Sequence, residues 1–180
     1  NYIFVMALLA TDPAYDPKPS GVSRETVLAR ARACLAYMTR SHATGDLVCA
    51  DGFQWGNHWQ SAWWTAKMAA GARLLWPHLT PEERESVERV VVHEADRHLH
   101  RVPPSGMTSD TKSEENGWDT EVIAWAIGLF PKHPNSAAWR TKLSEFCMNT
   151  LSAPQDKNDT TVVDGKPVKD WVVSTNIHED

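Results

Sequence analysis

The sequence lacks the features of two protein classes. No apolar stretch approaches the roughly 20 residues that a membrane-spanning helix needs. Lys and Arg number 18 against 23 Asp and Glu, a net charge of -5, so no excess of positive charge is present to attract nucleic acid. The sequence therefore predicts a protein with neither a membrane nor a nucleic acid as partner.

Cysteine is also scarce. The three cysteines, Cys34, Cys49 and Cys147, are far apart and form no CxxC pair. This spacing argues against a zinc site and against a disulfide framework, so we expect buried thiols. A single disulfide bridge stays open as an alternative.

Tryptophan, by contrast, is abundant. The 180-residue chain has nine tryptophans against three tyrosines and four phenylalanines. Indole rings fill helical cores, and their faces also bind the C–H faces of sugar rings. We expect core packing for Trp63, Trp64, Trp76, Trp125 and Trp139, and both roles stay open for Trp55, Trp59 and Trp118.

The helical segments are of two kinds that alternate along the chain. Some are apolar on nearly every side and should be surrounded by other helices, whereas the others have one apolar and one charged face, as surface helices do. This alternation predicts an all-α fold of antiparallel helical hairpins, with an inner and an outer ring. The apolar segments are 1–10, 59–76 and 122–130, and the amphipathic ones are 23–42, 80–100 and 135–150.

Local signals mark several helix boundaries. Thr80, Pro81 and Glu83 form a capping box with proline at the first helical position, which predicts a helix start at residue 81. Asn135 is expected to cap the last amphipathic helix. The small residues 69–72 of the second apolar helix should let a neighbouring backbone approach closely.

The end of the chain lacks the helical pattern of the preceding segments. Residues 160–168, with an Asp-Gly turn, predict a small β-hairpin. We therefore expect a helical domain over residues 1–155 and a β-hairpin or extended segment over 156–180. The first apolar segment has no cap at its start, so we expect a helix entered part-way. The partner that completes it would be the remainder of a longer chain or a second subunit.

Two long loops lead into the second and third apolar helices. Residues 43–57 and 101–116 both exceed the usual length of a helix–helix connection, and long ordered loops are commonly functional. Because antiparallel helices alternate in direction, both loops should lie at the same end of the helices. We expect the functional site at that end.

Each long loop ends in a cluster of polar and tryptophan side chains. Amides and carboxylates read sugar hydroxyls, indoles bind sugar faces, and a helix N-terminus favours an anionic ligand. The clusters therefore predict a site for an acidic oligo- or polysaccharide. The catalytic candidates are Asn57, His58, Glu114, Glu115 and Asp119, and the substrate-binding candidates are Asp51, Gln54, Trp55, Trp59, Gln60, Asn116 and Trp118.

With the motifs Trp-Gly-Asn-His-Trp-Gln-Ser (55–61) and Ser-Glu-Glu-Asn-Gly-Trp-Asp (113–119), the alternating helices resemble a known architecture. It is the (α/α) toroid of polysaccharide lyases of heparinase- and alginate-lyase-like type and of six-hairpin glycosidases. The resemblance covers most of the chain as architecture. Toroid lyases use an Asn to neutralise the uronate carboxylate, with His and Tyr as base and acid, and Asn57 and His58 match the first two. Neither loop contains tyrosine, so the resemblance implies a Tyr from elsewhere.

Two mechanisms follow from these residues. In β-elimination, Asn57 and Asn116 would polarise the uronate carboxylate and His58 would remove the C5 proton. In hydrolysis, two carboxylates would flank the glycosidic oxygen. We favour elimination because an Asn-His pair at a helix start suits an anionic sugar. A non-catalytic carbohydrate-binding or scaffolding domain is the third alternative. The carboxylate candidates for hydrolysis are Asp51, Glu114, Glu115 and Asp119.

These signals also have purely structural explanations. An asparagine before a helix can serve only as its cap, and acidic residues at a helix start can simply complement the helix dipole. The histidine-rich segment 93–100 lacks the histidine spacing of the HExxH zinc motif, so we expect a solvated helix face there and no metal site. No cofactor is indicated, and a structural calcium ion at the acidic loops stays open as an alternative.

Overall fold

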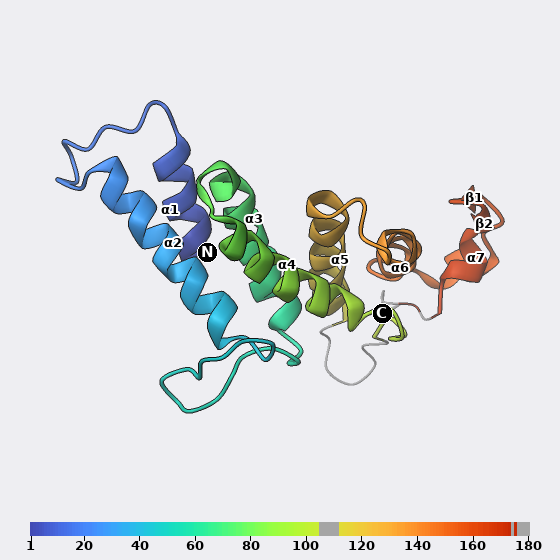
Figure 1. Cartoon of the computed structure of the whole chain (residues 1–180). Coiled ribbons are helices and arrows are strands. Elements are labelled where there is room, and N and C mark those ends of the chain that lie inside the picture. Colours follow the sequence, from blue (N-terminus) through green and yellow to red (C-terminus); the bar gives the residue numbers. More distant parts are fainter. Residues whose placement is uncertain (105–111, 174, 176–180) are drawn as a thin grey trace. The chain divides into compact units, whose positions relative to one another are not determined.

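The computed structural model describes residues 1–104, 112–173 and 175, which are mostly helical (Figure 1). This confirms the predicted all-α character, with a small antiparallel hairpin near the C-terminus. The α-helices are α1 (Tyr2–Thr11), α2 (Arg24–Ser41), α3 (Ser61–Leu75), α4 (Pro81–Asp96), α5 (Lys112–Leu129), α6 (Ser136–Met148) and α7 (Val168–Trp171). Two 3-10 helices, η1 (Trp76–His78) and η2 (Pro154–Asn158), and two strands, β1 (Val162–Val163) and β2 (Lys166–Pro167), complete the elements.

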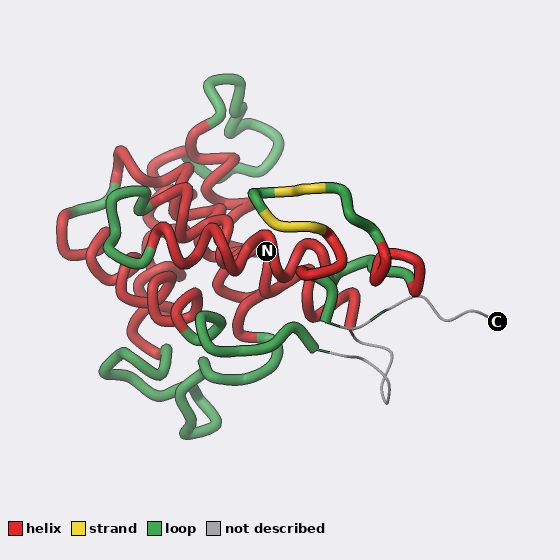
Figure 2. Tube along the Cα trace, turned by 90° about the vertical axis from the view of Figure 1, so that its right-hand side faces the viewer, coloured by secondary structure: helices red, strands yellow, loops and turns green. Residues whose placement is uncertain are grey.

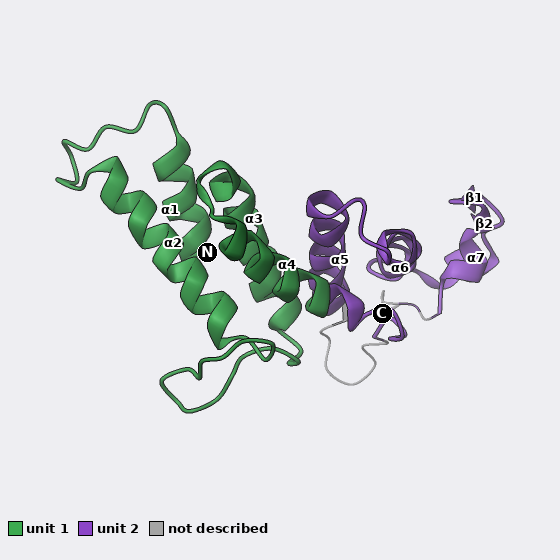
Figure 3. Ribbon diagram, viewed as in Figure 1, with its two compact units in different colours: residues 1–94 green, residues 95–180 purple. Residues whose placement is uncertain are grey.

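The chain divides into two compact units, residues 1–94 and 95–180 (Figure 3). The division falls inside α4, whereas the predicted change from helices to hairpin follows residue 155. Part of the second predicted loop, residues 105–111, and the polar chain end 176–180 lie outside the described residues. Within the described ranges, no helix combines the length and the apolar character needed to span a bilayer.

In the first unit, α1 packs against both α2 and α3 (Figure 1). The contact with α3 is close at Gly71, where an added Cβ would lie 2.7 Å from Cγ2 of Ile3 and 3.0 Å from the backbone nitrogen of Phe4. Glycine is therefore required there because the α1 backbone occupies the space of a side chain. The close approach predicted for the small residues 69–72 is confirmed.

The outward side of α1 differs from the prediction. A helix that is apolar all round was expected to be surrounded, yet Tyr2, Val5 and Leu8 are 55%, 49% and 47% exposed. The reason is that α2 and α3 cover α1 on one side, burying Ile3 and Ala7. The first unit thus presents an apolar helical face.

The amphipathic helices of this unit begin where the sequence predicts. Ser23 caps α2 by accepting a hydrogen bond from the backbone N–H of Thr26. Thr80 and Glu83 form the predicted capping box of α4, with bonds of 2.8 and 3.3 Å between each side chain and the other's backbone N–H. Glu83 also accepts two hydrogen bonds from Arg32, which joins α4 to α2.

In the second unit, α5 packs against α6, and Trp139 is buried as predicted. Its indole Nε1 donates to Asp96 Oδ1 at 2.8 Å, and Asn135 donates to the same oxygen at 2.9 Å. The expectation that Asn135 caps α6 is therefore only partly right. The helix begins directly after Asn135, but the Asn135 side chain makes no cap hydrogen bond and donates to Asp96.

The predicted hairpin is present (yellow in Figure 2). Its turn places Asp164 and Gly165 at φ values of 50° and 78°, the left-handed pair that an Asp-Gly hairpin turn requires. Trp171 of α7 covers the hairpin, because its Nε1 donates to the carbonyl of Val163 at 3.0 Å. The Lys166 ammonium lies 4.4 Å from the centre of the same indole ring.

The three cysteines are free thiols. Cys34 and Cys49 are half-buried and Cys147 is exposed, so the expectation of buried thiols is wrong. Cys34 and Cys147 lie on helices and Cys49 in the loop after α2, and neighbouring elements cover these positions only in part.

Candidate functional site

The first polar loop, residues 43–57, is joined to the end of α2 by backbone hydrogen bonds. Trp55 donates its backbone N–H to the carbonyl of Ser41 at 3.1 Å and accepts from the backbone N–H of Ala43 at 2.6 Å. The Trp55 side chain is 8% exposed, and its Nε1 donates to the carbonyl of Met38 at 2.8 Å. This corrects its predicted role: Trp55 anchors the loop to α2 and has no open indole face for a sugar.

Gln54 and the ion pair of Arg40 with Asp46 also fix the same loop. Gln54 donates from Nε2 to the carbonyls of Gly45 and Leu47, at 3.0 and 3.1 Å, so its amide group holds the loop in place of the predicted substrate contact. Arg40 and Asp46 form a two-bond pair, with both N–O distances 2.9 Å. Hydrogen bonding from Arg40 lowers the pKa of the Asp46 carboxyl below its ordinary value.

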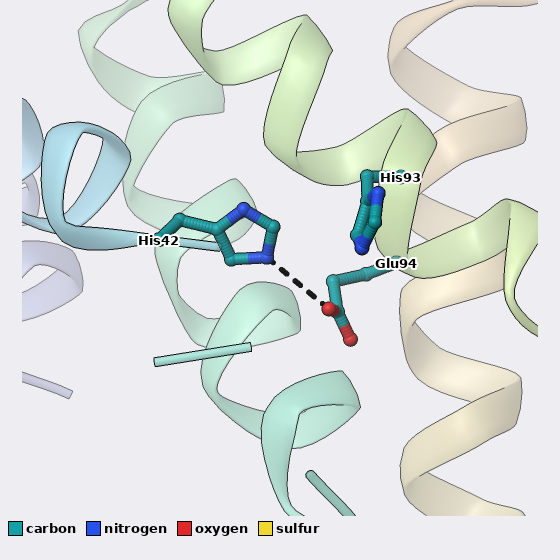
Figure 4. A group of neighbouring side chains, drawn as sticks. All are labelled: His42, His93 and Glu94. Atoms are coloured by element: carbon teal, nitrogen blue, oxygen red, sulfur yellow. Dashed lines mark hydrogen bonds and ion pairs between the residues drawn. The ribbon is translucent and has the colours of Figure 1, made fainter. Parts of the chain in front are cut away.

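A buried polar pair lies beneath the loop. His42, the residue that follows α2, and Glu94, near the end of α4, are both fully buried, and His42 Nε2 lies 3.2 Å from Glu94 Oε1 (Figure 4). The other ring nitrogen of His42 lies 2.8 Å from Oγ1 of Thr44. Burying two ionisable groups is costly unless each is hydrogen-bonded, and here both are.

Asn57 connects this buried pair to the surface. Its φ of 60° is left-handed, which is uncommon for a residue other than glycine. Its backbone N–H donates to Glu94 Oε1 at 3.3 Å, and its side-chain Oδ1 accepts from His93 Nε2 at 2.9 Å. The cap position of α3 is Gln60. Asn57 therefore does not cap this helix, which was the structural alternative to a functional role.

Asn57, His58 and Trp59 are consecutive and all exposed, with Trp59 52% exposed. The backbone N–H of His58 donates to Ser61 Oγ at 2.9 Å, which connects the segment to the first residue of α3. These three predicted site residues are therefore brought together on one rigid, accessible segment. Asp51 is also exposed and accepts from the backbone N–H of Phe53, whereas Gln60 is half-buried.

Sequence reasoning missed three residues at this place. His42, His93 and Glu94 bring one ligating atom each to within 4.8 Å of one another (Figure 4). The expectation of a solvated face over residues 93–100 is wrong, because Glu94 and His98 are fully buried. These two residues follow Val87 and Val90 at helical spacing, which is the signal that could have placed them on the buried stripe.

The second predicted cluster lies in the other unit, at the start of α5. Glu115 pairs with Arg101 at 3.0 Å, and the fully buried Asp119 lies 3.5 Å from both Arg101 and His98. Glu114 is exposed and Trp118 is half-buried. The helix begins at Lys112, earlier than the predicted loop end at residue 116, so all of these candidates lie on the helix itself.

Asn116 of this cluster is fully buried, which corrects its predicted contact with substrate. Its Nδ2 donates to the carbonyl of Asn149 at 3.0 Å. Asn149, also fully buried, donates in turn to the carbonyls of Glu145 and Trp171, at 2.7 and 2.9 Å. Asn116 thus helps to join α5, α6 and α7. Because the two clusters lie in different units, their convergence in one cleft remains a prediction.

A cavity of about 520 Å³ lies elsewhere in the first unit, between α1, α2 and α3. Its lining is largely apolar and includes Ile3, Met38, Trp63 and Trp64. The predicted site residues are not part of this lining. The polar residues predicted for the site are therefore on the loop surface and not in this cavity.

Comparison with known proteins yields no relative: no protein-family model, no curated protein and no solved structure matches the chain.

Proposed function

We propose that the chain is part of an (α/α) toroid enzyme that cleaves glycosidic linkages in an acidic, uronic-acid-containing polysaccharide by β-elimination. The observation that carries this proposal is the exposed segment Asn57-His58-Trp59, held from beneath by His93 and Glu94. The segment combines an amide, an imidazole and an indole on one fixed stretch of backbone.

The toroid part of the proposal is supported by the packing of α1. This apolar helix lies against its hairpin partner α2 and against the next apolar helix, α3, as an inner-ring helix would. Its other side exposes Tyr2, Val5 and Leu8. In a closed toroid, further helices from a longer chain or a second subunit would cover this face.

The catalytic part rests on how Asn57 is held. Because His93 donates to Oδ1 of Asn57, the amide Nδ2 group is the part that would donate to a uronate carboxylate. Stabilising that carboxylate as it gains enolate character makes the C5 proton easier to remove. The neighbouring His58 would take the C5 proton, and a double bond would form between C4 and C5 as the C4–O bond breaks. The electron pair of that bond would stay on the leaving sugar oxygen, which takes a proton from water or from an acid supplied by another part of the enzyme. The exposed Trp59 would stack on a sugar face.

Hydrolysis receives less support from the carboxylates around this segment. Glu94 is buried and accepts from Asn57, and Asp46 pairs with Arg40. In the second unit, Glu115 pairs with Arg101 and Asp119 is buried. The two exposed candidates, Asp51 and Glu114, belong to different units. A hydrolase would need two accessible carboxylates on either side of the glycosidic oxygen.

An absorbance assay tests the proposal. A full-length form of the protein is incubated with alginate, heparin or polygalacturonate, and the ultraviolet absorbance of the C4–C5 double bond is followed. We expect a steady increase that falls by roughly 10²–10³-fold in Asn57→Ala and His58→Ala, the size of a lost transition-state contact. His78→Ala is the matched control, because His78 is an exposed histidine on η1 of the same unit.

The other outcomes discriminate among the alternatives. Release of reducing ends without the absorbance would replace elimination by hydrolysis. Binding of the polysaccharide without either signal would leave a non-catalytic carbohydrate-binding domain. Full activity in both Asn57→Ala and His58→Ala would contradict the assignment of the site.

A further inference from the structure

The side chains of His42, His93 and Glu94 converge from two elements, the end of α2 and the last turns of α4 (Figure 4). His42 and Glu94 are fully buried and His93 is half-buried. Each offers one ligating atom, and these atoms lie within 4.8 Å of one another. The three residues therefore form a cluster of potential metal ligands that is buried at His42 and Glu94 and partly exposed at His93.

Two imidazoles and one carboxylate are a ligand set that zinc uses in sites with three protein ligands and a fourth, open position. Zinc bonds of about 2.0–2.2 Å place neighbouring ligand atoms roughly 3.4 Å apart in a tetrahedron. His42 Nε2 and Glu94 Oε1 are 3.2 Å apart, close to this spacing. Imidazole ligands disfavour Mg²⁺ and Ca²⁺, which take oxygen ligands. We propose that His42, His93 and Glu94 bind a divalent transition-metal ion of the zinc class.

Hydrogen bonds behind His42 suit this assignment. When Nε2 binds a metal, the ring proton is on Nδ1 and needs an acceptor. Thr44 Oγ1 is 2.8 Å from Nδ1 and also accepts from Arg89 Nη1 at 2.7 Å, so it holds the ring in a fixed orientation. Without metal, Nδ1 accepts from the backbone N–H of Thr44 and Nε2 donates to Glu94. Metal binding thus exchanges one neutral tautomer of His42 for the other.

Asn57 lies at the open side of the trio. With Nε2 of His93 as the ligand, Oδ1 of Asn57 lies 2.9 Å from the ligating atom. This amide oxygen, or a water molecule that it binds, would complete the four ligands. A bound ion would then connect three places: His42 at the start of the loop, Glu94 on α4, and the left-handed residue Asn57. This inference does not depend on the proposed carbohydrate activity.

A structural explanation without metal is also open to test. In that case His42 and Glu94 are a buried hydrogen-bonded pair that joins the loop to α4, and His93 only orients Asn57. The two explanations predict different results when His93 is removed. If the trio binds a metal, the loss of His93 abolishes binding, whereas the buried pair of His42 and Glu94 stays intact in either case. His93 is half-buried, so its truncation should be tolerated by the fold.

Calorimetric titration of the metal-free chain with Zn²⁺ decides between them. We expect one ion per chain. Loss of a residue that only hydrogen-bonds a metal ligand lowers the metal affinity by roughly 10–100-fold, and His93→Ala should lower it by more because a ligand itself is lost. Thr44→Val should show the smaller, supporting-partner effect. His78→Ala, which removes an exposed histidine from the same unit, should bind as the parent chain does. Circular dichroism of each variant verifies that it is folded.

Titration with Co²⁺ gives an independent signal, since tetrahedral nitrogen and oxygen ligands produce intense visible absorption. That absorption should appear at one equivalent and disappear in His93→Ala. The proposal would be overturned by the absence of stoichiometric Zn²⁺ binding, by unchanged binding in folded His93→Ala, or by an equal loss in His78→Ala. Binding of Ca²⁺ in preference to Zn²⁺ would also overturn it.

Discussion

Asn57 donates its backbone N–H to Oε1 of Glu94 across 3.3 Å, so a fully buried carboxylate on α4 fixes a left-handed residue of an exposed loop. The same oxygen lies 3.2 Å from His42 Nε2 at the end of α2. One buried side chain therefore sets the position of the segment on which the proposed chemistry depends.

Removing that carboxylate should destabilise the first unit. In Glu94→Ala, His42 and the N–H of Asn57 lose their buried acceptor, for which we expect a decrease in the free energy of unfolding of about 2–4 kcal/mol. Urea unfolding measures the change. Glu88→Ala, at an exposed position of the same helix, should change the free energy by less than about 0.5 kcal/mol. Equal stability of the two variants would mean that Glu94 does not hold the loop.

Gly56 should tolerate no side chain. Its φ is +116°, and an added Cβ would lie 2.7 Å from His42 Nε2. Gly52 in the same loop has a φ of +85° but open space around its Cβ position. Gly52→Ala should therefore cost about 1 kcal/mol for backbone strain alone, and Gly56→Ala at least twice as much. A smaller loss in Gly56→Ala than in Gly52→Ala, measured by thermal unfolding, would contradict the packing of His42.

Two helical glycines should respond with opposite signs. Gly71→Ala places a methyl group against the α1 backbone, and overpacking of this kind costs about 1–3 kcal/mol. Gly117 in α5 has no atom within 4 Å of its Cβ position, so Gly117→Ala should stabilise by up to about 1 kcal/mol through helix propensity. Stabilisation by Gly71→Ala in chemical denaturation would disprove the close contact of α1 with α3.

The Arg40–Asp46 pair predicts a pH dependence of the loop. Since Arg40 lowers the pKa of Asp46 in the folded state, the pair stabilises the loop above the ordinary pKa of aspartate and loses this effect as the pH falls through the lowered value. In an NMR titration, Asp46 should have its midpoint below the ordinary value, and this midpoint should rise in Arg40→Gln because the largest cause of the lowering is lost. Arg30→Gln, at an exposed position of α2, should leave the midpoint in place.

Much of the secondary structure was predictable because its signals are local. The capping box at Thr80, the small residues around Gly71 and the Asp-Gly turn after Val163 each act through neighbours in sequence or along one helix face. The exposed face of α1 was not predictable in this way. Apolar character shows that a helix has something to bury, but it does not show which partner buries it.

The site was predicted in part for the same reason. Asn57, His58 and Trp59 were found because they are consecutive and polar or aromatic before a helix. Their supports, His93 and Glu94, are 36 and 37 positions from Asn57, and no spacing rule relates them to it. The backbone bonds of Trp55 and Gln54 were not predictable, because a loop side chain that bonds a backbone carbonyl has the same composition as one that binds a ligand.

The most direct test of the central claim is an amide NMR titration of the chain with a short uronic-acid oligosaccharide. We predict that the largest chemical-shift changes will fall on Asn57, His58 and Trp59, and that Asn57→Ala will weaken them. A neutral oligosaccharide of the same length should cause smaller changes, because it has no carboxylate for the Asn57 amide. If the acidic sugar leaves these three residues unchanged, or perturbs them no more than the neutral one does, the proposed site is wrong.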